Sequence, residues 1–257
     1  MEELSTRWLA PDPGRLWQTA VVTRVVAETQ QATTLTLDLG EPPEFLPGQY
    51  YLVRLALDSP PWAIEQPYSV SSSPYPPSAL IEITVRQVPG GRASQTLTQK
   101  LSLGDQIHLR GPFGFLTWSE DSGGPLVLIG AGSGVAPLMS IIRYAKLRCA
   151  NVDMALICSS REFSSVLFRS ELELLAATTK SLRVAHTFTR SGADEYSHFH
   201  RRIDAAMINE ATYHLRGIDP ARVTYLVAGS ADMVASTRYA LYELGVAEYQ
   251  IMSEDHA

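Results

Sequence analysis

The chain has 257 residues, of which 45% are hydrophobic and 19% charged, and its formal net charge is -6. This length and apolar content can fill the core of one large domain or two modest ones, so the composition excludes a disordered chain. The acidic balance argues against a nucleic-acid partner, because binding to a phosphate backbone needs clustered positive charge.

The first half of the sequence has the period of β-strands. Residues 1–15 show no clear period, so we expect an N-terminal arm there. Apolar and polar residues alternate over much of 21–110, and proline and glycine clusters divide this stretch into short segments. The pattern predicts an antiparallel sheet or barrel over residues 16–120, interrupted by one short helix at 94–101.

The second half changes to apolar strands separated by amphipathic helices. This alternation predicts a doubly wound parallel sheet with helices on both faces, over residues 121–257. Strands are expected at 126–129, 154–158, 182–188, 223–227 and 249–252. Helices are expected at 138–149, 165–177 and 231–244. The sequence therefore predicts two domains, with a boundary near residues 118–124.

Compartment and metal chemistry can also be judged from the sequence. No apolar run reaches the roughly 18 residues of a membrane helix, and the start of the chain lacks the basic and apolar regions of a signal peptide. We expect a cytoplasmic protein with no membrane span. Cys149 and Cys158 are too few for a four-cysteine metal site, and we expect both to be buried and inert. The histidines lack metal-ligand spacing, so no metal site is expected and any redox chemistry would use an organic cofactor.

A glycine-rich turn, GAGSGVAP at residues 130–137, joins the first parallel strand to the first helix. Its backbone could approach a ligand closely, and a helix starting near Pro137 would present unpaired N–H groups that favour a phosphate. The same glycines could serve only the tight packing of strand on helix. The turn also fits the S-adenosylmethionine site of a methyltransferase, and it does not match the dinucleotide fingerprint with three spaced glycines.

Several further motifs accompany the glycine turn in a fixed order along the chain. They are PGQY at 47–50, QPYS at 66–69, GG-x-x-S at 90–94, GPFG at 111–114, VAGS at 227–230 and Glu254. This ordered set resembles the ferredoxin–NADP reductase superfamily, and the resemblance covers residues 17–256. It implies a β-barrel domain that binds FAD, followed by an α/β domain that binds NADPH or NADH.

The resemblance places the flavin on the QPYS stretch. It implies that Tyr68 packs against the isoalloxazine ring, that Ser69 hydrogen-bonds near flavin N5, and that Ser69 and Glu254 are the catalytic residues. An extended strand would also leave backbone groups for the pyrimidine edge. The N–H groups and hydroxyl at the start of the short helix would receive the pyrophosphate. The implied flavin site comprises Gln66, Pro67, Tyr68, Ser69, Val85, Arg86, Gly90, Gly91, Arg92 and Ser94.

One flavin residue departs from the family pattern. Gln66 stands where the family has an arginine that pairs with the flavin phosphate. A glutamine can hydrogen-bond but supplies neither charge nor a guanidinium fork. Arg86 and Arg92 are candidates to compensate for this loss. By analogy with the family we expect FAD rather than FMN.

The second domain is expected to bind the nicotinamide nucleotide. Its pyrophosphate would lie over the glycine turn, against Gly132, Gly134 and Val135. Arg161, Arg190 and Arg202 resemble the basic residues that NADPH-using relatives place around a 2′-phosphate, so they favour NADPH over NADH. Each of them alone is also typical of a solvated surface arginine.

Two departures lie near the expected nicotinamide. Ala228 stands where family members often have cysteine, and His256 stands where an aromatic residue would cover the flavin. Hydride transfer needs no protein acid or base, because the two cofactors carry the chemistry and the protein aligns them. We predict a flavin-dependent NAD(P)H oxidoreductase that passes single electrons to a separate acceptor protein, which could be a ferredoxin, a haem protein or an oxygenase component. The departures leave an alternative, a non-catalytic flavin-binding electron-transfer or interaction subunit of a larger complex.

Overall fold

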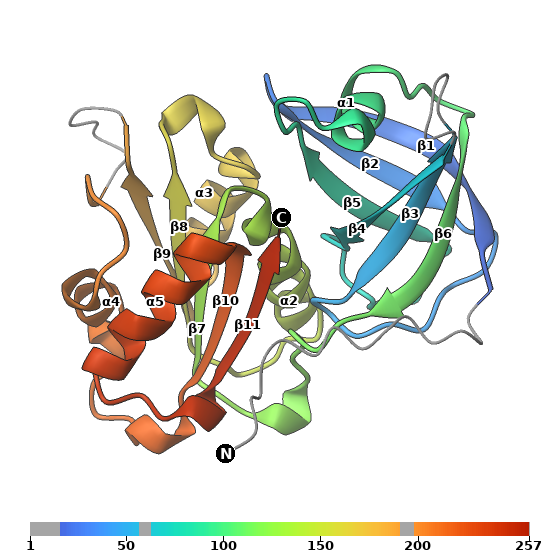
Figure 1. Cartoon of the computed structure of the whole chain (residues 1–257). Helices are drawn as coiled ribbons and strands as arrows, with labels where there is room; N and C mark the ends of the chain where they lie inside the picture. Colours follow the sequence, from blue (N-terminus) through green and yellow to red (C-terminus); the bar gives the residue numbers. More distant parts are fainter. Residues whose placement is uncertain (1–15, 57–62, 191–197, 257) are drawn as a thin grey trace, which may run out of the picture.

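The computed structural model of the chain describes residues 16–56, 63–190 and 198–256. It consists of a β domain followed by an α/β domain, with helix α2 (Val135–Leu147) on the side of the second domain that faces the first (Figure 1). This is the predicted order of an antiparallel barrel and a doubly wound parallel sheet. The arm expected at 1–15 lies outside the described residues.

The β domain is a six-stranded antiparallel sheet with the strand order β4-β3-β6-β1-β2-β5. Its two edges meet where Val70, just after β4, pairs with Ile83 of β5, so the sheet closes into a barrel. Alternate residues of a strand point to one face, and Leu35, Leu37 and Ile81 are all fully buried in the interior. The strands are β1 (Gln18–Thr29), β2 (Ala32–Asp38), β3 (Tyr50–Ala56), β4 (Ala63–Ser69), β5 (Leu80–Arg86) and β6 (Gln106–Phe113).

The α/β domain is a five-stranded parallel sheet with the order β11-β10-β7-β8-β9. The chain runs outward from β7 through β8 to β9 and then returns to β10 on the other side of β7. This reversal between β7 and β10 is the point where open parallel sheets bind ligands, at the carboxyl ends of the strands. The strands are β7 (Leu126–Ala131), β8 (Met154–Ser160), β9 (Leu182–Phe188), β10 (Thr224–Ser230) and β11 (Ile251–His256).

Helices cover both faces of the parallel sheet, as the strand–helix alternation predicts (Figure 1). Helices α2 and α3 (Arg169–Thr178) form one buried cluster with the sheet, and α4 (Ala205–Ala211) and α5 (Ala231–Glu243) form another. Leu116 and Trp118, in the segment after β6, are each 2% exposed and belong to the cluster of α2 and α3. The connection between the domains is therefore packed against the second domain.

Some expected element bounds were wrong, for local reasons. Helix α3 begins at Arg169 rather than 165, because a turn closed by Glu162 and Ser165 and a left-handed Phe168 come first. The last strand begins at Ile251 rather than 249, because Glu248–Gln250 forms a 3₁₀ turn.

Two further expectations about helices were also wrong. Helix α2 begins at Val135 instead of near Pro137, and α1 covers Arg92–Gln99 instead of 94–101. Helix α4 was not predicted, although Asp204 caps it by accepting a hydrogen bond from the Met207 N–H.

The two cysteines have different environments. Cys158 on β8 is buried, which raises the pKa of its thiol to about 12, as expected of an inert cysteine. Cys149 is exposed, contrary to expectation. It lies two residues beyond α2 in the left-handed conformation, and the N–H groups of Cys149 and Ala150 close the helix end on Lys146 and Ala145. The apolar period of α2 therefore stops before Cys149.

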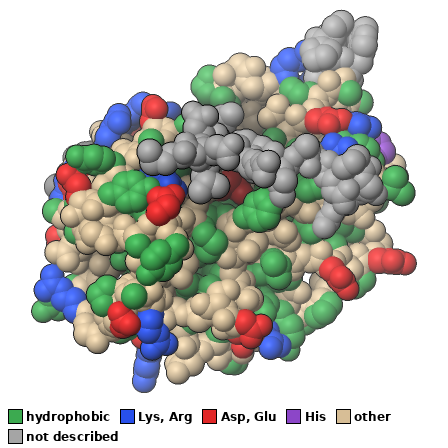
Figure 2. Space-filling model, turned by 60° about the horizontal axis from the view of Figure 1, so that its bottom comes forward, with side chains coloured by type: hydrophobic (Ala, Val, Ile, Leu, Met, Phe, Trp, Pro, Cys, Tyr) green, Lys and Arg blue, Asp and Glu red, His purple; other side chains and the backbone are tan. Residues whose placement is uncertain are grey.

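The surface carries both signs of charge. On the face that Figure 2 shows, the described acidic and basic side chains are interspersed instead of gathered by sign. No helix within the described ranges is both long and apolar enough to cross a bilayer.

Candidate functional site

Strand β4 forms a ledge at the edge where the barrel closes. Gln66 and Pro67 are exposed, Tyr68 is half-buried and Ser69 is 6% exposed. Tyr68 packs against the barrel core, and burial raises the pKa of its phenol. A neutral aromatic ring that is partly covered by the core and partly open suits a flat ligand. The four QPYS residues therefore lie together, as the resemblance implies.

The end of β11 brings Glu254 to this ledge. The side chains of Ser69 and Glu254 are hydrogen-bonded, and burial, reinforced by the Asp255 charge, raises the pKa of Glu254 to about 7. Tyr50 on β3 is close enough for the Glu254 charge to contribute to a raised pKa of its phenol, after burial. A Cβ on Gly114 would come within 3.3 Å of Glu254 Oε2. Three segments distant in sequence from β11 thus surround a carboxyl group that titrates near neutral pH.

We expect Glu254→Gln to change how stability depends on pH. The folded chain keeps the Glu254 proton up to about pH 7, whereas an unfolded chain loses it near 4.5. The folded state binds more protons in that window, so the free energy of unfolding falls as the pH rises through it. Glutamine removes this loss and should raise stability by about 2 kcal/mol at pH 8 and by little at pH 4, allowing for partial exposure.

Urea unfolding of the cofactor-free chain across this pH range measures the effect. Glu248→Gln is the control, because its partners Tyr242 and Arg238 lower the pKa of Glu248. That variant should lose stability at high pH, opposite in sign to Glu254→Gln. A Glu254→Gln profile parallel to that of the unsubstituted chain would contradict the assignment.

The glycine turn lies at the strand-order reversal, between β7 and α2. Gly134 is the N-cap of α2, and a Cβ there would lie 2.1 Å from the Ala228 carbonyl oxygen on β10. For this glycine the tight-packing explanation holds. Gly132 has φ +55 and is half-exposed, and a Cβ there would lie 2.8 Å from Arg86 Nη1. The turn is thus tightly packed at Gly134, whereas at Gly132 it is half-exposed and faces Arg86.

Arg86 of the barrel lies beside Gly132, and two arginines of the second domain, Arg161 and Arg190, act on it electrostatically. Arg86 ends β5, and burial lowers its pKa, with further lowering by the charges of Arg161 and Arg190. The Arg190 N–H donates to the Arg161 carbonyl at 2.9 Å, which joins the ends of β8 and β9. No carboxylate in the described ranges offsets these charges at Arg86. An uncompensated guanidinium group beside a glycine turn, with two more positive charges near it, fits a bound phosphate.

The other expected cofactor-binding residues are more dispersed. The Ser94 hydroxyl accepts from the Val88 N–H and donates to the Gly91 carbonyl, both at 3.0 Å, so it ties its own turn together. Arg92 is the half-buried first residue of α1, and Val85 is fully buried in the barrel core. Arg202 is exposed, two residues before the cap of α4. His256 ends β11, paired through its backbone with Ser230.

A pocket of about 310 Å³ lies between α3 and β9, and the sequence analysis missed it. Its walls include Phe163, Phe188, His186 and His198. Burial, with a smaller effect of His198, lowers the pKa of His186 to about 4, and His186 Nδ1 is buried without a hydrogen-bond partner among the described residues. The only signal in the sequence was that His186 and Phe188, two positions apart on a strand, point to the same face of the sheet. The described residues contain no group of three side chains placed to hold a metal ion.

Known protein families and solved structures match both domains of the chain, in the same order. A family model described as an oxidoreductase FAD-binding domain matches residues 19–118, and one described as an oxidoreductase NAD-binding domain matches residues 128–239. A solved ferredoxin NADP+ reductase from Neisseria gonorrhoeae, with bound FAD and NADP, aligns with a TM-score of 0.77 and 25% identity over 93% of this chain and 98% of that chain. The chain belongs to the ferredoxin–NADP reductase superfamily.

Curated relatives of this superfamily member are longer than the chain itself. A flavohemoprotein of Bordetella pertussis is 29% identical over 249 residues, which are 93% of this chain and 60% of the relative. The ferredoxin–NAD(P)+ reductase component of a naphthalene 1,2-dioxygenase system from Pseudomonas putida is 32% identical over 180 residues, which are 70% of this chain and 52% of the relative. The chain thus spans about 60% or less of these two relatives.

Proposed function

We propose that the chain is a flavin-dependent NAD(P)H reductase that passes electrons to a separate acceptor protein. The observation that carries the proposal is the junction of Tyr68, Ser69 and Glu254 at the seam between the barrel and the parallel sheet. When bound, FAD supplies the redox chemistry, since it takes an electron pair from a reduced nicotinamide and releases electrons singly. The two matched domain families, in this order, support the same pair of cofactors.

Each part of the site has a proposed role. Tyr68 would stack on the flavin ring, and the Ser69 hydroxyl, held by Glu254, would position the reacting edge. With its pKa raised to about 7, Glu254 gains and loses its proton near neutral pH, so it carries less charge at the flavin site than an ordinary carboxylate would. Gln66, Pro67 and the N–H groups at the start of α1 line the rest of the flavin site.

The nicotinamide nucleotide takes the other side of the seam. Its pyrophosphate would lie over Gly132, so we propose that Arg86, which lies beside this glycine, binds that pyrophosphate rather than the flavin phosphate. The adenosine end would extend toward Arg161, Arg190 and the pocket beside Phe188. The paired arginines favour NADPH, which carries an extra phosphate.

The acceptor is proposed from the chemistry of the relatives. One relative is named a flavohemoprotein and another a reductase component of a dioxygenase system. We propose a ferredoxin, a haem protein or an oxygenase component for this chain, in the cytoplasm. Gln66, Ala228 and His256, the three departures from the family pattern, are the basis of the alternative proposal, a non-catalytic flavin-binding electron-transfer or interaction subunit of a larger complex.

Anaerobic titration tests the proposal directly. The purified chain should carry FAD, identified by absorbance and mass, and lose the flavin absorbance on addition of NADPH, with a weaker response to NADH. It should then reduce a 2Fe–2S ferredoxin or a cytochrome in stoichiometric amounts. A chain that retains flavin but is reduced by neither nucleotide would favour the non-catalytic subunit, and one that takes up no flavin would refute both.

A further inference from the structure

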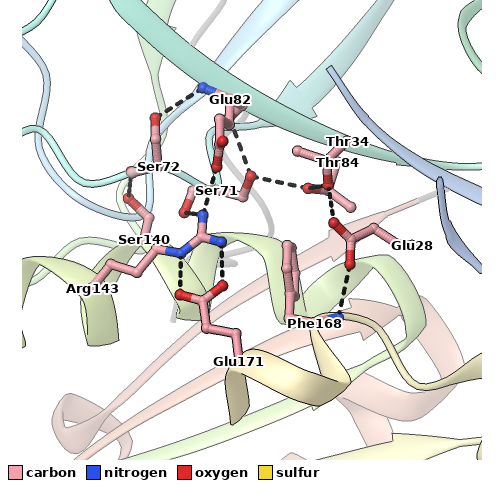
Figure 3. Close-up of polar contacts among 10 residues, drawn as sticks. All are labelled: Glu28, Thr34, Ser71, Ser72, Glu82, Thr84, Ser140, Arg143, Phe168 and Glu171. Atoms are coloured by element: carbon pink, nitrogen blue, oxygen red, sulfur yellow. Dashed lines mark hydrogen bonds and ion pairs between the residues drawn. The ribbon is translucent and has the colours of Figure 1, made fainter. Parts of the chain in front are cut away.

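The two domains meet in a polar contact between helix α2 and the segment that follows β4 (Figure 3). Arg143 on α2 donates from Nη1 to the Ser71 carbonyl at 2.8 Å and to Glu82 Oε2 at 2.9 Å, both in the barrel. Ser140, one turn earlier on α2, donates to the Ser72 carbonyl at 2.6 Å. We call the following set the interdomain bridge: Ser71, Ser72, Glu82, Ser140, Arg143 and Glu171.

The bridge is braced within each domain. Glu171 on α3 accepts from Arg143 Nε at 2.8 Å and from Nη2 at 2.6 Å, a two-bond pairing that fixes the plane of the guanidinium group. On the barrel side the Ser72 hydroxyl accepts from the Glu82 N–H at 2.9 Å. The Arg143 side chain is only 18% exposed, so water competes weakly for its bonds.

A second polar chain crosses the same interface. Glu28 on β1 accepts from the Phe168 N–H of the second domain at 3.2 Å and from the Thr34 hydroxyl at 2.8 Å. Thr34 contacts the Thr84 hydroxyl at 2.8 Å, which contacts that of Ser71 at 2.9 Å. The hydrogen bonds in Figure 3 thus run from Phe168 through the barrel and back to the residue that Arg143 holds.

Both ends of the bridge are close in sequence to the proposed cofactor residues. Ser71 comes two residues after Ser69, in the segment that closes the barrel against β5. Arg143 lies on the helix that starts at Val135, directly after the glycine turn. A helix and a paired strand are stiff, so a shift of α2 relative to Ser71 would shift the nucleotide turn relative to the flavin ledge.

We propose that the interdomain bridge sets the distance between the two bound cofactors, with Arg143 as its positioning residue. The proposal rests on the reductase function given above. Hydride transfer requires reacting atoms about 3–3.5 Å apart, and a displacement of about 1 Å can cost roughly 100-fold in rate. Arg143 contacts none of the proposed cofactor residues, so its influence on the rate would come through domain orientation.

Amide hydrogen exchange in the cofactor-free chain tests the bridge itself. Arg143→Met should speed exchange of the Phe168 and Glu82 amides about tenfold or more and leave that of Leu156, in the core of β8, unchanged. Arg238→Met is the matched control, because Arg238 is 27% exposed and its ion pair with Glu248 lies within one domain. The control should leave the interface amides unchanged. Unaltered interface exchange in Arg143→Met would overturn the proposal.

Stopped-flow reduction of the FAD-loaded protein tests the positioning role. Arg143→Met should lower the limiting rate of flavin reduction by NADPH about 30-fold, with less than about a threefold change in NADPH affinity. Arg143→Lys should recover part of the rate, since lysine restores charge without the fork. If Arg143→Met is too unstable to purify, Ser140→Ala should show a smaller loss of the same kind.

Two outcomes would count against Arg143. An unchanged limiting rate would overturn the positioning role, and so would a parallel loss of rate, affinity and Leu156 protection, which marks a general stability defect. If NADPH does not reduce the flavin of the unsubstituted protein, the proposed function is refuted instead. The exchange result would still decide whether the bridge holds the domains together.

Discussion

The double substitution Arg86→Met and Arg190→Met is expected to weaken NADPH binding about 100-fold or more. Each substitution would remove a charge-assisted hydrogen bond to a phosphate, worth roughly 1.5–3 kcal/mol. A loss of about 2.7 kcal/mol corresponds to a factor of 100 in the dissociation constant. The two side chains come from different domains, and the charge of Arg190 is near enough to lower the pKa of Arg86. Calorimetric titration of the FAD-loaded protein with NADPH, and with NADH, measures the loss.

The single substitutions separate two phosphate positions. Arg86→Met should weaken NADPH and NADH alike, because Arg86 lies at Gly132, where the shared pyrophosphate is proposed. Arg190→Met should weaken NADPH far more than NADH if it holds the 2′-phosphate. Arg216→Met is the control, since Arg216 stacks on Tyr213 elsewhere in the same domain. Affinities within twofold of the unsubstituted protein for both single variants would refute the arginine site.

Ser69→Ala is expected to slow flavin reduction about 30-fold while leaving FAD bound. The substitution removes the hydrogen bond between Ser69 and Glu254, and bonds to such groups contribute about 1.5–3 kcal/mol. That bond lowers the pKa of Glu254 from what burial alone would set, so its loss should move the pKa of Glu254 above 7. The pH dependence of the reduction rate should then shift upward with it.

The control for Ser69→Ala is Ser73→Ala in the same segment. The Ser73 hydroxyl bonds only to the backbone of Tyr75 in the contacts described, at 2.7 and 3.0 Å. This variant should keep both the rate and the pH profile. An Ser69→Ala enzyme with unchanged rate and profile would mean that the hydroxyl does not reach the reacting atoms.

The sequence contained enough local information to predict both sheets. Alternation such as that of Leu35 and Leu37 marks a barrel strand on its own, and the ordered motifs add the resemblance that selects Ser69 and Glu254. The QPYS ledge could be predicted for the same reason, because strand direction and burial follow from neighbouring residues. Those parts depend on short stretches of chain.

Contacts between distant segments could not be predicted in this way. The helical face expected on α2 was read from its apolar residues, so Ser140 and Arg143 carried no signal until the barrel lay against them. Arg86 was assigned to the flavin phosphate from its place in the sequence, and its closeness to Gly132 depends on how the two domains dock. Cys149 was placed by helical period beyond the point where the helix ends.

The burial of Leu116 and Trp118 beneath the second domain affects how the protein could be divided into fragments. Residue 120 looks like a natural cut point in the sequence, yet a barrel fragment ending there would display two large apolar side chains that α2 and α3 normally cover. The complementary fragment, the second domain alone, would have a cavity where these two side chains normally pack. We therefore expect neither fragment to be stable when it is produced alone. A fragment of the second domain should begin before Leu116, so that this segment stays with the helices that cover it.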